Sequence, residues 1–260
     1  MNKHISSTTN PLVKQLLQLK LKSKLRKTSG LFVIEGQREI SLALAGRYEI
    51  EVVFYLDNFP IKNLPDGAIE YISLSQNVYE KVAHRGTTEG LLAIAKVRNH
   101  QLTSIELNSK NPLILVAEAP EKPGNIGALL RTADAAQLDA VIIANPKTDL
   151  YNPNIIRSSV GCLFTLPIAT GNTEEVIAWL QNKGIRPMAA ALDKAESYLT
   201  ADYTSASALV VGTEDEGLSD LWLKAAHKII KIPMSGQIDS MNVSVAAAVL
   251  IFEAKRQRAI

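Results

Sequence analysis

The sequence contains few of the residues that build disulfides and zinc sites. Cys162 is the only cysteine among 260 residues, so no disulfide can form within the chain. The four histidines are scattered without ligand spacing; they are His4, His84, His100 and His227. We therefore expect no metal centre, and we expect Cys162 to be a small core residue.

Long apolar runs are missing as well. No segment approaches the roughly 20 apolar residues that a membrane-spanning helix needs. The first residues contain no apolar stretch of signal-peptide length. We therefore expect a cytoplasmic protein without a membrane partner. Apolar residues still make up 47% of the chain, which is ample for buried cores.

Acidic residues are absent from the first 34 positions, which hold seven basic residues. Residues 1–100 carry 14 Lys and Arg against 9 Asp and Glu, whereas residues 101–260 carry 14 against 17. Positive charge gathered in this way suits a phosphate backbone, although a solvated, solubilising helix face is the alternative. The candidate phosphate contacts are Lys14, Lys20, Lys22, Lys24, Arg26 and Lys27.

Apolar runs alternate with amphipathic stretches along the chain, which indicates an α/β protein. Residues 1–100 are predicted to form a small α/β domain, residues 101–111 a polar linker and residues 112–260 a second domain. Asn10 and Pro11 favour a helix start, because Asn caps helices and Pro suits the first helical position.

The apolar runs of the second domain are nearly continuous, which is typical of a parallel sheet covered on both faces. Its strands are predicted at residues 113–117, 140–144, 163–168, 187–191, 208–211 and 229–232, and its helices at 126–136 and 173–182. The last helix, residues 243–258, is apolar all round as far as Phe252. We expect this helix to be buried in the core or against a second subunit.

Three polar, glycine-marked segments stand among these apolar runs, at residues 123–134, 211–219 and 232–246. They read PGNIGALLRTAD, VGTEDEGLS and IPMSGQIDSMNVSVA. Parallel sheets bind ligands outside the carboxyl ends of their strands, where glycine lets the backbone approach a ligand closely. We therefore predict that the three segments form one composite site.

The order N-x-G-x-x-x-R, G-x-E-x-x-G-L-S and I-P-M-x-G-x-x-x-S-x-N-V-S-V-A resembles the three signature motifs of the SpoU (TrmH-like) RNA ribose methyltransferases, of the SPOUT class. The resemblance covers residues 111–260. It implies transfer of a methyl group from S-adenosylmethionine to a ribose 2'-hydroxyl of rRNA or tRNA. It also implies a deep trefoil knot and a homodimer with the cofactor site close to the interface. Residues 31–36 and the helix after them resemble the ribosomal-protein-like domain that precedes such catalytic domains.

The resemblance also assigns roles to individual residues. The implied catalytic residues are Arg131, Asn125, Glu214, Ser240 and Asn242. The implied cofactor contacts are Gly212, Thr213, Glu214, Gly217, Ile232, Met234, Gly236, Ser240, Met241 and Asn242. Arg157 lies in a segment that resembles a family segment and is a candidate phosphate contact. A guanidinium is effectively never deprotonated, so we expect Arg131 to orient the hydroxyl together with a substrate phosphate.

Plainer interpretations of the same residues stay open. Asn125, Ser240 and Asn242 suit helix capping as well as chemistry. The three acids 214–216 suggest a divalent metal site, although neighbouring side chains on one loop diverge. For the whole chain, a non-catalytic RNA-binding or ribosome-assembly protein of the same fold is one alternative. A nucleotide-binding enzyme that acts on small molecules is another.

Overall fold

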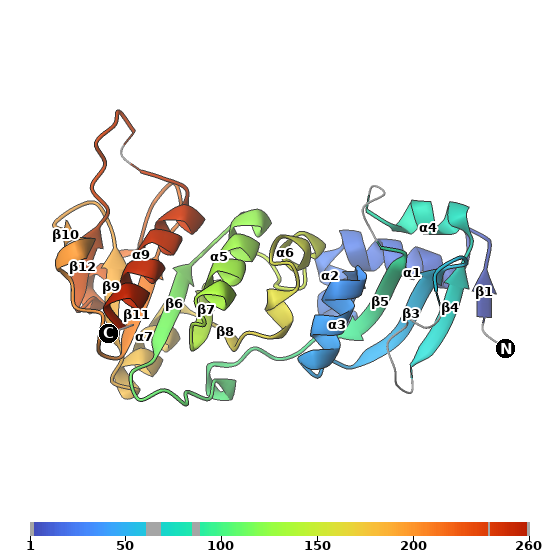
Figure 1. The fold of residues 1–260 in the computed structure, drawn as a ribbon, viewed down its shortest axis with the longest axis horizontal. Coiled ribbons are helices and arrows are strands. Elements are labelled where there is room, and N and C mark those ends of the chain that lie inside the picture. Colours follow the sequence, from blue (N-terminus) through green and yellow to red (C-terminus); the bar gives the residue numbers. More distant parts are fainter. Residues whose placement is uncertain (1–2, 61–68, 85–88, 239, 259–260) are drawn as a thin grey trace. The chain divides into compact units, whose positions relative to one another are not determined.

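The computed structural model describes residues 3–60, 69–84, 89–238 and 240–258. The chain packs into two units, Met1–Asn99 with Asp149–Thr165, and His100–Thr148 with Leu166–Ile260. Each unit has its own sheet (Figure 1). Residues 149–165 thus pack with the first unit although they lie within the stretch predicted as the second domain. Residues 101–111, the predicted linker, belong to the second unit, where Ile105 is buried in the core.

The first unit contains a mixed five-stranded sheet in the order β1-β4-β3-β5-β2. Strands β1, β4 and β3 pair in parallel, and β5 pairs antiparallel with β3 and β2. The strands are β1 (Lys3–Ile5), β2 (Leu31–Glu35), β3 (Ile50–Leu56), β4 (Glu70–Leu74) and β5 (Leu91–Lys96). The helices are α1 (Pro11–Leu21), α2 (Ser23–Ser29), α3 (Gln37–Ala45) and α4 (Gln76–Val82). The α/β domain predicted for this region is confirmed.

Helix α1 begins where the sequence predicts. The Asn10 side chain accepts a hydrogen bond from the backbone N of Leu12, and Pro11 is the first helical residue. Val13, Leu16 and Leu19 are fully buried against the sheet, in one core with residues of α4. Helix α2 follows without a predicted counterpart and ends at Ser29, where Gly30 caps it in the left-handed conformation.

The segment 149–165 packs through aromatic side chains. The Tyr151 ring lies 4.2 Å from that of Phe32, and the Phe164 ring lies 5.0 Å from that of Tyr48. The strand predicted at 163–168 is wrong. Cys162–Phe164 form a short 3-10 turn, and the strand begins only at Ile168. Leu163 and Phe164 are apolar because they are buried in the first unit, not because they belong to a strand.

The second unit is built on a seven-stranded parallel sheet in the order β10-β12-β9-β11-β6-β7-β8. The parallel sheet predicted from the apolar runs is confirmed. Its strands are β6 (Leu113–Glu118), β7 (Ala140–Ala144), β8 (Ile168–Gly171), β9 (Arg186–Ala190), β10 (Glu196–Ser197), β11 (Ser207–Val211) and β12 (Lys228–Lys231).

Helices cover both faces of this sheet (Figure 1). One core joins strand residues such as Ile114, Val116 and Val210 to α7 and α8. On the opposite face α5 and α9 lie side by side, and α9 contacts β11. The helices are α5 (Pro123–Ala135), α6 (Pro153–Ser158), α7 (Thr173–Asn182), α8 (Asp220–Ala225) and α9 (Val243–Arg258), of which α6 belongs to the first unit.

Helix α9 is buried along one face only. Ala247, Leu250 and Ile251 are buried, whereas Val245 and Phe252 are 52% and 53% exposed. Within the described residues, no helix combines the length and apolar character needed to cross a bilayer. The trefoil knot implied by the resemblance stays a prediction.

Candidate active site

The three polar segments predicted to form one site follow strands β6, β11 and β12 of the second unit. All strands of this sheet are parallel, so their carboxyl ends lie along one edge. β6 and β11 are direct neighbours, and β12 is separated from β11 by β9 alone. The structure therefore brings the first and second motifs together directly. Side-chain contacts of Asn242 connect the third motif to both.

Glu214 is the residue on which the three motifs converge. Its Oε1 accepts a hydrogen bond of 2.9 Å from Nδ2 of Asn125 and one of 2.8 Å from Nδ2 of Asn242. The same Asn242 nitrogen lies 3.1 Å from Oδ1 of Asn125. Oε2 of Glu214 is paired with the ammonium of Lys122, which precedes the first motif. We call Asn125, Glu214 and Asn242 the motif cluster.

The structure shows which of Asn125 and Asn242 acts as a helix cap. Asn125 is the third residue of α5, whose cap position is held by Lys122, so the capping interpretation of Asn125 is wrong. Asn242 both caps α9 and takes part in the motif cluster. Its Oδ1 accepts from the backbone N and the hydroxyl of Ser244 at the start of α9, while its amide nitrogen donates to the cluster.

Charge keeps this cluster in one protonation state. The Lys122 ammonium, followed by the Asn125 amide, holds the pKa of Glu214 below its ordinary value. The Glu214 carboxylate in turn raises the pKa of Lys122. Glu214 is therefore an ionised acceptor near neutral pH, and Lys122 is a fixed cation rather than a base. In the part of the chain that the structure describes, no three His, Cys, Asp or Glu residues converge to hold a metal ion.

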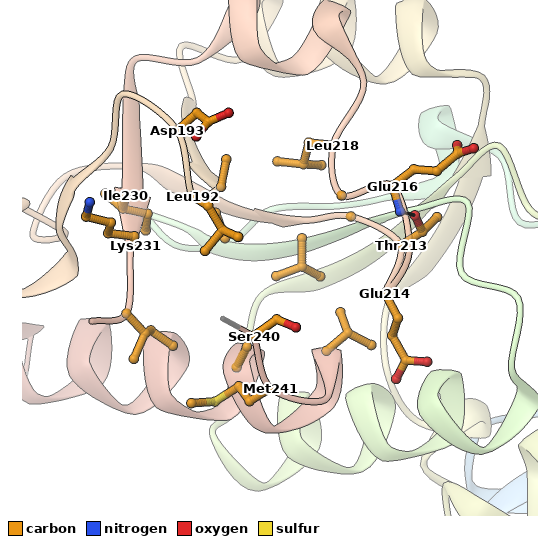
Figure 2. A pocket seen from close by; sticks show the side chains of 18 of the residues that line it. Leu192, Asp193, Thr213, Glu214, Glu216, Leu218, Ile230, Lys231, Ser240 and Met241 are labelled. Carbon is orange, nitrogen blue, oxygen red and sulfur yellow. Dashed lines mark hydrogen bonds between the residues drawn. The ribbon is translucent and has the colours of Figure 1, made fainter. Parts of the chain in front are cut away.

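A pocket of about 660 Å³ opens beside the motif cluster. Figure 2 shows Ser240 and Met241 on one side of it and Leu192, Thr213 and Leu218 across from them. Eight of the implied cofactor contacts line this pocket: Gly212, Thr213, Glu214, Gly217, Ile232, Met234, Ser240 and Met241. Two predicted cofactor contacts, Gly236 and Asn242, are not among the lining residues.

The loop of the second motif is tight because of two glycines. A Cβ on Gly212 would lie 2.2 Å from the carbonyl of Gly217, so only glycine fits. Gly217 itself has φ +69°, which glycine adopts without strain. The backbone N of Thr213 donates to the carbonyl of Gly217 at 3.0 Å, and this bond closes the turn.

Sequence reasoning missed one wall of the pocket. Residues Ala190–Asp193, at and after the end of β9, line it together with Leu218, Leu223 and Leu250. The position of this loop after a strand of a parallel sheet was an available signal, but the loop has no glycine and no motif to single it out. Acidic residues outnumber basic ones in the lining, which contains Asp193, Glu214, Asp215 and Glu216 but one lysine, Lys231. This negative rim favours a cationic ligand.

Arg131 lies exposed on α5, six positions after Asn125. It does not line the pocket. Ser240, the other implied catalytic residue, does line it and is itself exposed. The structure thus joins three of the five implied catalytic residues in one cluster, places Ser240 at the pocket, and leaves Arg131 on the exposed surface of the helix.

Two of the basic residues predicted to bind phosphate form ion pairs within the first unit. Arg26 is 3% exposed and pairs with Asp149 at 2.6 Å, and its guanidinium also donates to the Leu19 carbonyl. The ammonium of Lys20 is paired with Glu35 and donates to the Val82 carbonyl. Both cations already have acidic partners, so we do not propose Arg26 and Lys20 as phosphate contacts. The exposed members of the set are Lys14, Lys22, Lys24, Lys27 and, on α6, Arg157.

Two family models match the chain. Residues 112–252 match the SpoU rRNA Methylase family, and residues 10–93 match the MRM3-like substrate binding domain. The first match alone covers more than half of the 260 residues.

Named relatives agree with these matches. The chain is 29% identical over 250 residues to the 23S rRNA (guanosine(2553)-2'-O)-methyltransferase of Bacillus subtilis, covering 96% of this chain and 98% of that protein. It is 36% identical over 177 residues to the 23S rRNA (guanosine-2'-O-)-methyltransferase of Haemophilus influenzae, covering 67% and 72%.

Solved structures share the whole fold. A crystal structure of an RNA 2'-O ribose methyltransferase superposes with a TM-score of 0.85 at 38% identity, covering 99% of this chain and all of that one. The SpoU methyltransferase AviRb of Streptomyces viridochromogenes, in complex with AdoMet, gives a TM-score of 0.89 at 27% identity, covering 96% and 98%. Motifs, fold and sequence therefore agree that this chain belongs to the SpoU rRNA methylase family.

Proposed function

We propose that this protein transfers a methyl group from S-adenosylmethionine to a ribose 2'-hydroxyl of 23S rRNA. The observation that carries the proposal is the motif cluster at the edge of the pocket, where Glu214 joins Asn125 to Asn242. Its relatives of nearly equal length are named for this reaction on 23S rRNA. The choice of rRNA over tRNA rests on these relatives.

The pocket fits S-adenosylmethionine, a cationic molecule with a neutral heterocycle. Leu218, Leu223 and Leu250 supply apolar walls, and backbone groups at Gly212 and Met234 suit the edges of an adenine. The carboxylates at the rim suit the positive charge. When bound, the cofactor supplies an electrophilic methyl group.

The remaining catalytic task is to orient the ribose hydroxyl and draw away its proton. We assign the orientation to Arg131 acting with a phosphate of the substrate, because a guanidinium binds phosphate oxygens and does not act as a base. An oxygen of that phosphate accepts the hydroxyl proton as the methyl group leaves the cofactor sulfur. The motif cluster holds the first helix, the second loop and the third segment in one geometry. Such transfer depends on positioning, so this geometry contributes directly to the rate. Ser240, the remaining implied catalytic residue, lines the pocket.

We assign RNA binding to the first unit. Its match to a substrate-binding domain and its acid-free basic start support this assignment. The contacting cations are the exposed ones, Lys14, Lys22, Lys24, Lys27 and Arg157. Arg157 donates to Asn154 at 2.7 Å, which holds the guanidinium near the exposed end of α6. Scattered lysines bind the backbone and carry no base code.

A homodimer is also part of the proposal. Val245 and Phe252 lie seven positions apart on α9, so they share a helix face, and both are about half exposed. A large apolar side chain gains free energy when a second surface removes it from water. A second copy that covers this face would account for the apolar character of α9 on its exposed side.

The experiment is a transfer assay with labelled S-adenosylmethionine and ribosomal RNA from cells that lack this protein. Digestion to nucleosides should place the label in one 2'-O-methylated nucleotide. If the protein binds both the cofactor and RNA but no label is transferred, a non-catalytic RNA-binding role replaces the proposal.

A further inference from the structure

A buried carboxylate lies just before the first motif in the sequence and belongs to none of the three motifs. Glu118 is the last residue of β6, between the strand and the first motif, and it is 5% exposed. Among the described residues it has no ion-pair partner. A carboxylate removed from water without a cation is costly unless hydrogen bonds satisfy it.

Three donors satisfy Glu118. Its Oε2 accepts from the backbone N of Ser219 at 2.8 Å. Its Oε1 accepts from the hydroxyls of Ser219 and Thr173, each at 2.8 Å. Three hydrogen bonds from two residues converge on this one carboxyl group. The carboxylate therefore fixes the positions of both partners.

Ser219 is the last residue of the second motif and stands at the cap position of α8. A serine at this position usually accepts from a backbone N of the helix, but Ser219 makes no such bond. Its hydroxyl donates to Glu118 instead. The local capping bond is absent, and a long-range bond to β6 takes its place.

Thr173 extends the arrangement to the next two strands. It is 1% exposed and is the first residue of α7, one residue after β8 ends. Its hydroxyl donates to Glu118 and accepts from Nδ2 of Asn145, which follows β7. One carboxylate thus ties together the carboxyl ends of β6, β7 and β8 and the end of the second motif.

The second motif is therefore held at two points. On the pocket side its Glu214 accepts from Asn125 of the first motif, and at its other end Ser219 donates to the buried Glu118 of β6. Between these points the loop is stiffened by the turn from Thr213 to Gly217. A shift of Ser219 would therefore be transmitted to Glu214.

We propose that Glu118 is a positioning residue that sets the placement of Glu214 through Ser219. The inference rests on the proposed methyl transfer. A neutral isostere tests it, because in Glu118→Gln one oxygen becomes an amide nitrogen that cannot accept from Ser219. We expect kcat to fall about 10-fold to 100-fold, as misplacement of a catalytic group by about 1 Å would cause.

The matched control is Asp139→Asn. Asp139 accepts from the backbone N of Leu113 at 2.7 Å, so it is a carboxylate bound to the opposite end of the same strand. This variant should lower the melting temperature and leave kcat unchanged when it is assayed well below that temperature. Any methyl transfer by the wild-type protein keeps the proposed function intact, whatever the variants do.

A double-mutant cycle separates positioning from general loosening. In a Glu214→Ala background, Glu118→Gln should lower kcat by less than about twofold, because the group that it positions is already absent. A full further loss in that background would overturn the inference. So would a kcat of Glu118→Gln within about twofold of the wild type.

Ser219→Ala gives the same test if Glu118→Gln does not fold. This change removes one donor and leaves the carboxylate with its bonds from the Ser219 backbone N and the Thr173 hydroxyl. A several-fold fall in kcat, absent in the Glu214→Ala background, supports the inference. An unchanged kcat contradicts it.

Discussion

Nδ2 of Asn125 lies 2.9 Å from Oε1 of Glu214, although 89 positions separate the two residues in the chain. Asn242 donates to the same oxygen, so one carboxylate atom connects all three motifs. The side chain of Glu214 is 23% exposed, so it remains partly accessible to solvent. The loss of this acceptor should disconnect the motifs without disturbing the core.

Glu214→Ala should therefore lower the rate far more than the stability. We expect kcat to fall about 100-fold, because Asn125 and Asn242 lose their shared acceptor and the geometry on which transfer depends. The measurement is single-turnover methyl transfer, with the melting temperature recorded for each variant. Glu121→Ala, which removes an exposed acid beside Lys122, is the control and should keep the wild-type rate. Equal rates in both variants would contradict the assigned role.

Lys122 should determine the pH below which cofactor binding weakens. It lowers the pKa of Glu214 below the ordinary 4.5, so the carboxylate stays ionised above that pH and its contribution is lost only as pH falls through the lowered pKa. In Lys122→Met the pKa of Glu214 rises, and cofactor binding should begin to weaken at a higher pH than in the wild type. Calorimetric titration of S-adenosylmethionine at several pH values checks this shift. An unchanged pH dependence would mean that Glu214 does not control the site.

Neutralising exposed lysines of the first unit should weaken RNA binding without affecting turnover. Changing Lys22, Lys24 and Lys27 to Gln should raise the KM for RNA and leave kcat at saturating RNA unchanged. The slope of log affinity against log salt should fall by about 0.7 to 0.9 for each phosphate that a lysine no longer neutralises. The control changes three exposed lysines of the second unit, Lys110, Lys183 and Lys224. If both triple variants behave alike, the first unit does not carry the RNA contacts assigned to it.

Arg26→Ala should affect folding rather than RNA affinity. Burial raises the pKa of Asp149, but hydrogen bonds from Arg26 and Ser23 and the charges of Arg26 and Lys27 together hold that pKa below its ordinary value. Removing one partner of a buried ion pair costs about 3–5 kcal/mol. Urea unfolding at neutral pH should show this loss, and the loss should shrink as acid protonates Asp149. Exposed Lys27→Ala should leave the free energy of unfolding nearly unchanged. A fall in RNA affinity with unchanged stability would restore Arg26 to the phosphate contacts.

Much of the site could be predicted because its signals are local. Glycines and polar residues mark the carboxyl ends of β6, β11 and β12, and parallel strands bring such ends to one edge. The order of the motifs then identified Asn125, Glu214 and Asn242 as neighbours. Helix α1 was equally readable, because Asn10, Pro11 and the buried leucines all lie within a few turns of one another.

Several failures involve partners that are distant in sequence. Arg26 resembles its exposed lysine neighbours until Asp149, 123 positions later, binds it. Glu118 stands alone at a strand end, and its partners Thr173 and Ser219 lie 55 and 101 positions away. Residues 163–168 read as a strand because burial in the first unit and burial in a sheet leave the same apolar pattern. No periodicity within a short window distinguishes these cases.

The most direct test of the proposed reaction compares ribosomal RNA from four strains. One lacks this protein, the second carries the wild-type chain, and the third carries Arg131→Ala. The fourth carries Arg186→Ala, at the opposite end of the sheet on β9, as the matched arginine control. Mass spectrometry of digested 23S rRNA should show one 2'-O-methylated nucleotide that is lost without the protein. The wild type and the control should restore it, and Arg131→Ala should not. The same methylation pattern in all strains would contradict the proposed reaction, and restoration by Arg131→Ala would contradict the role of that arginine.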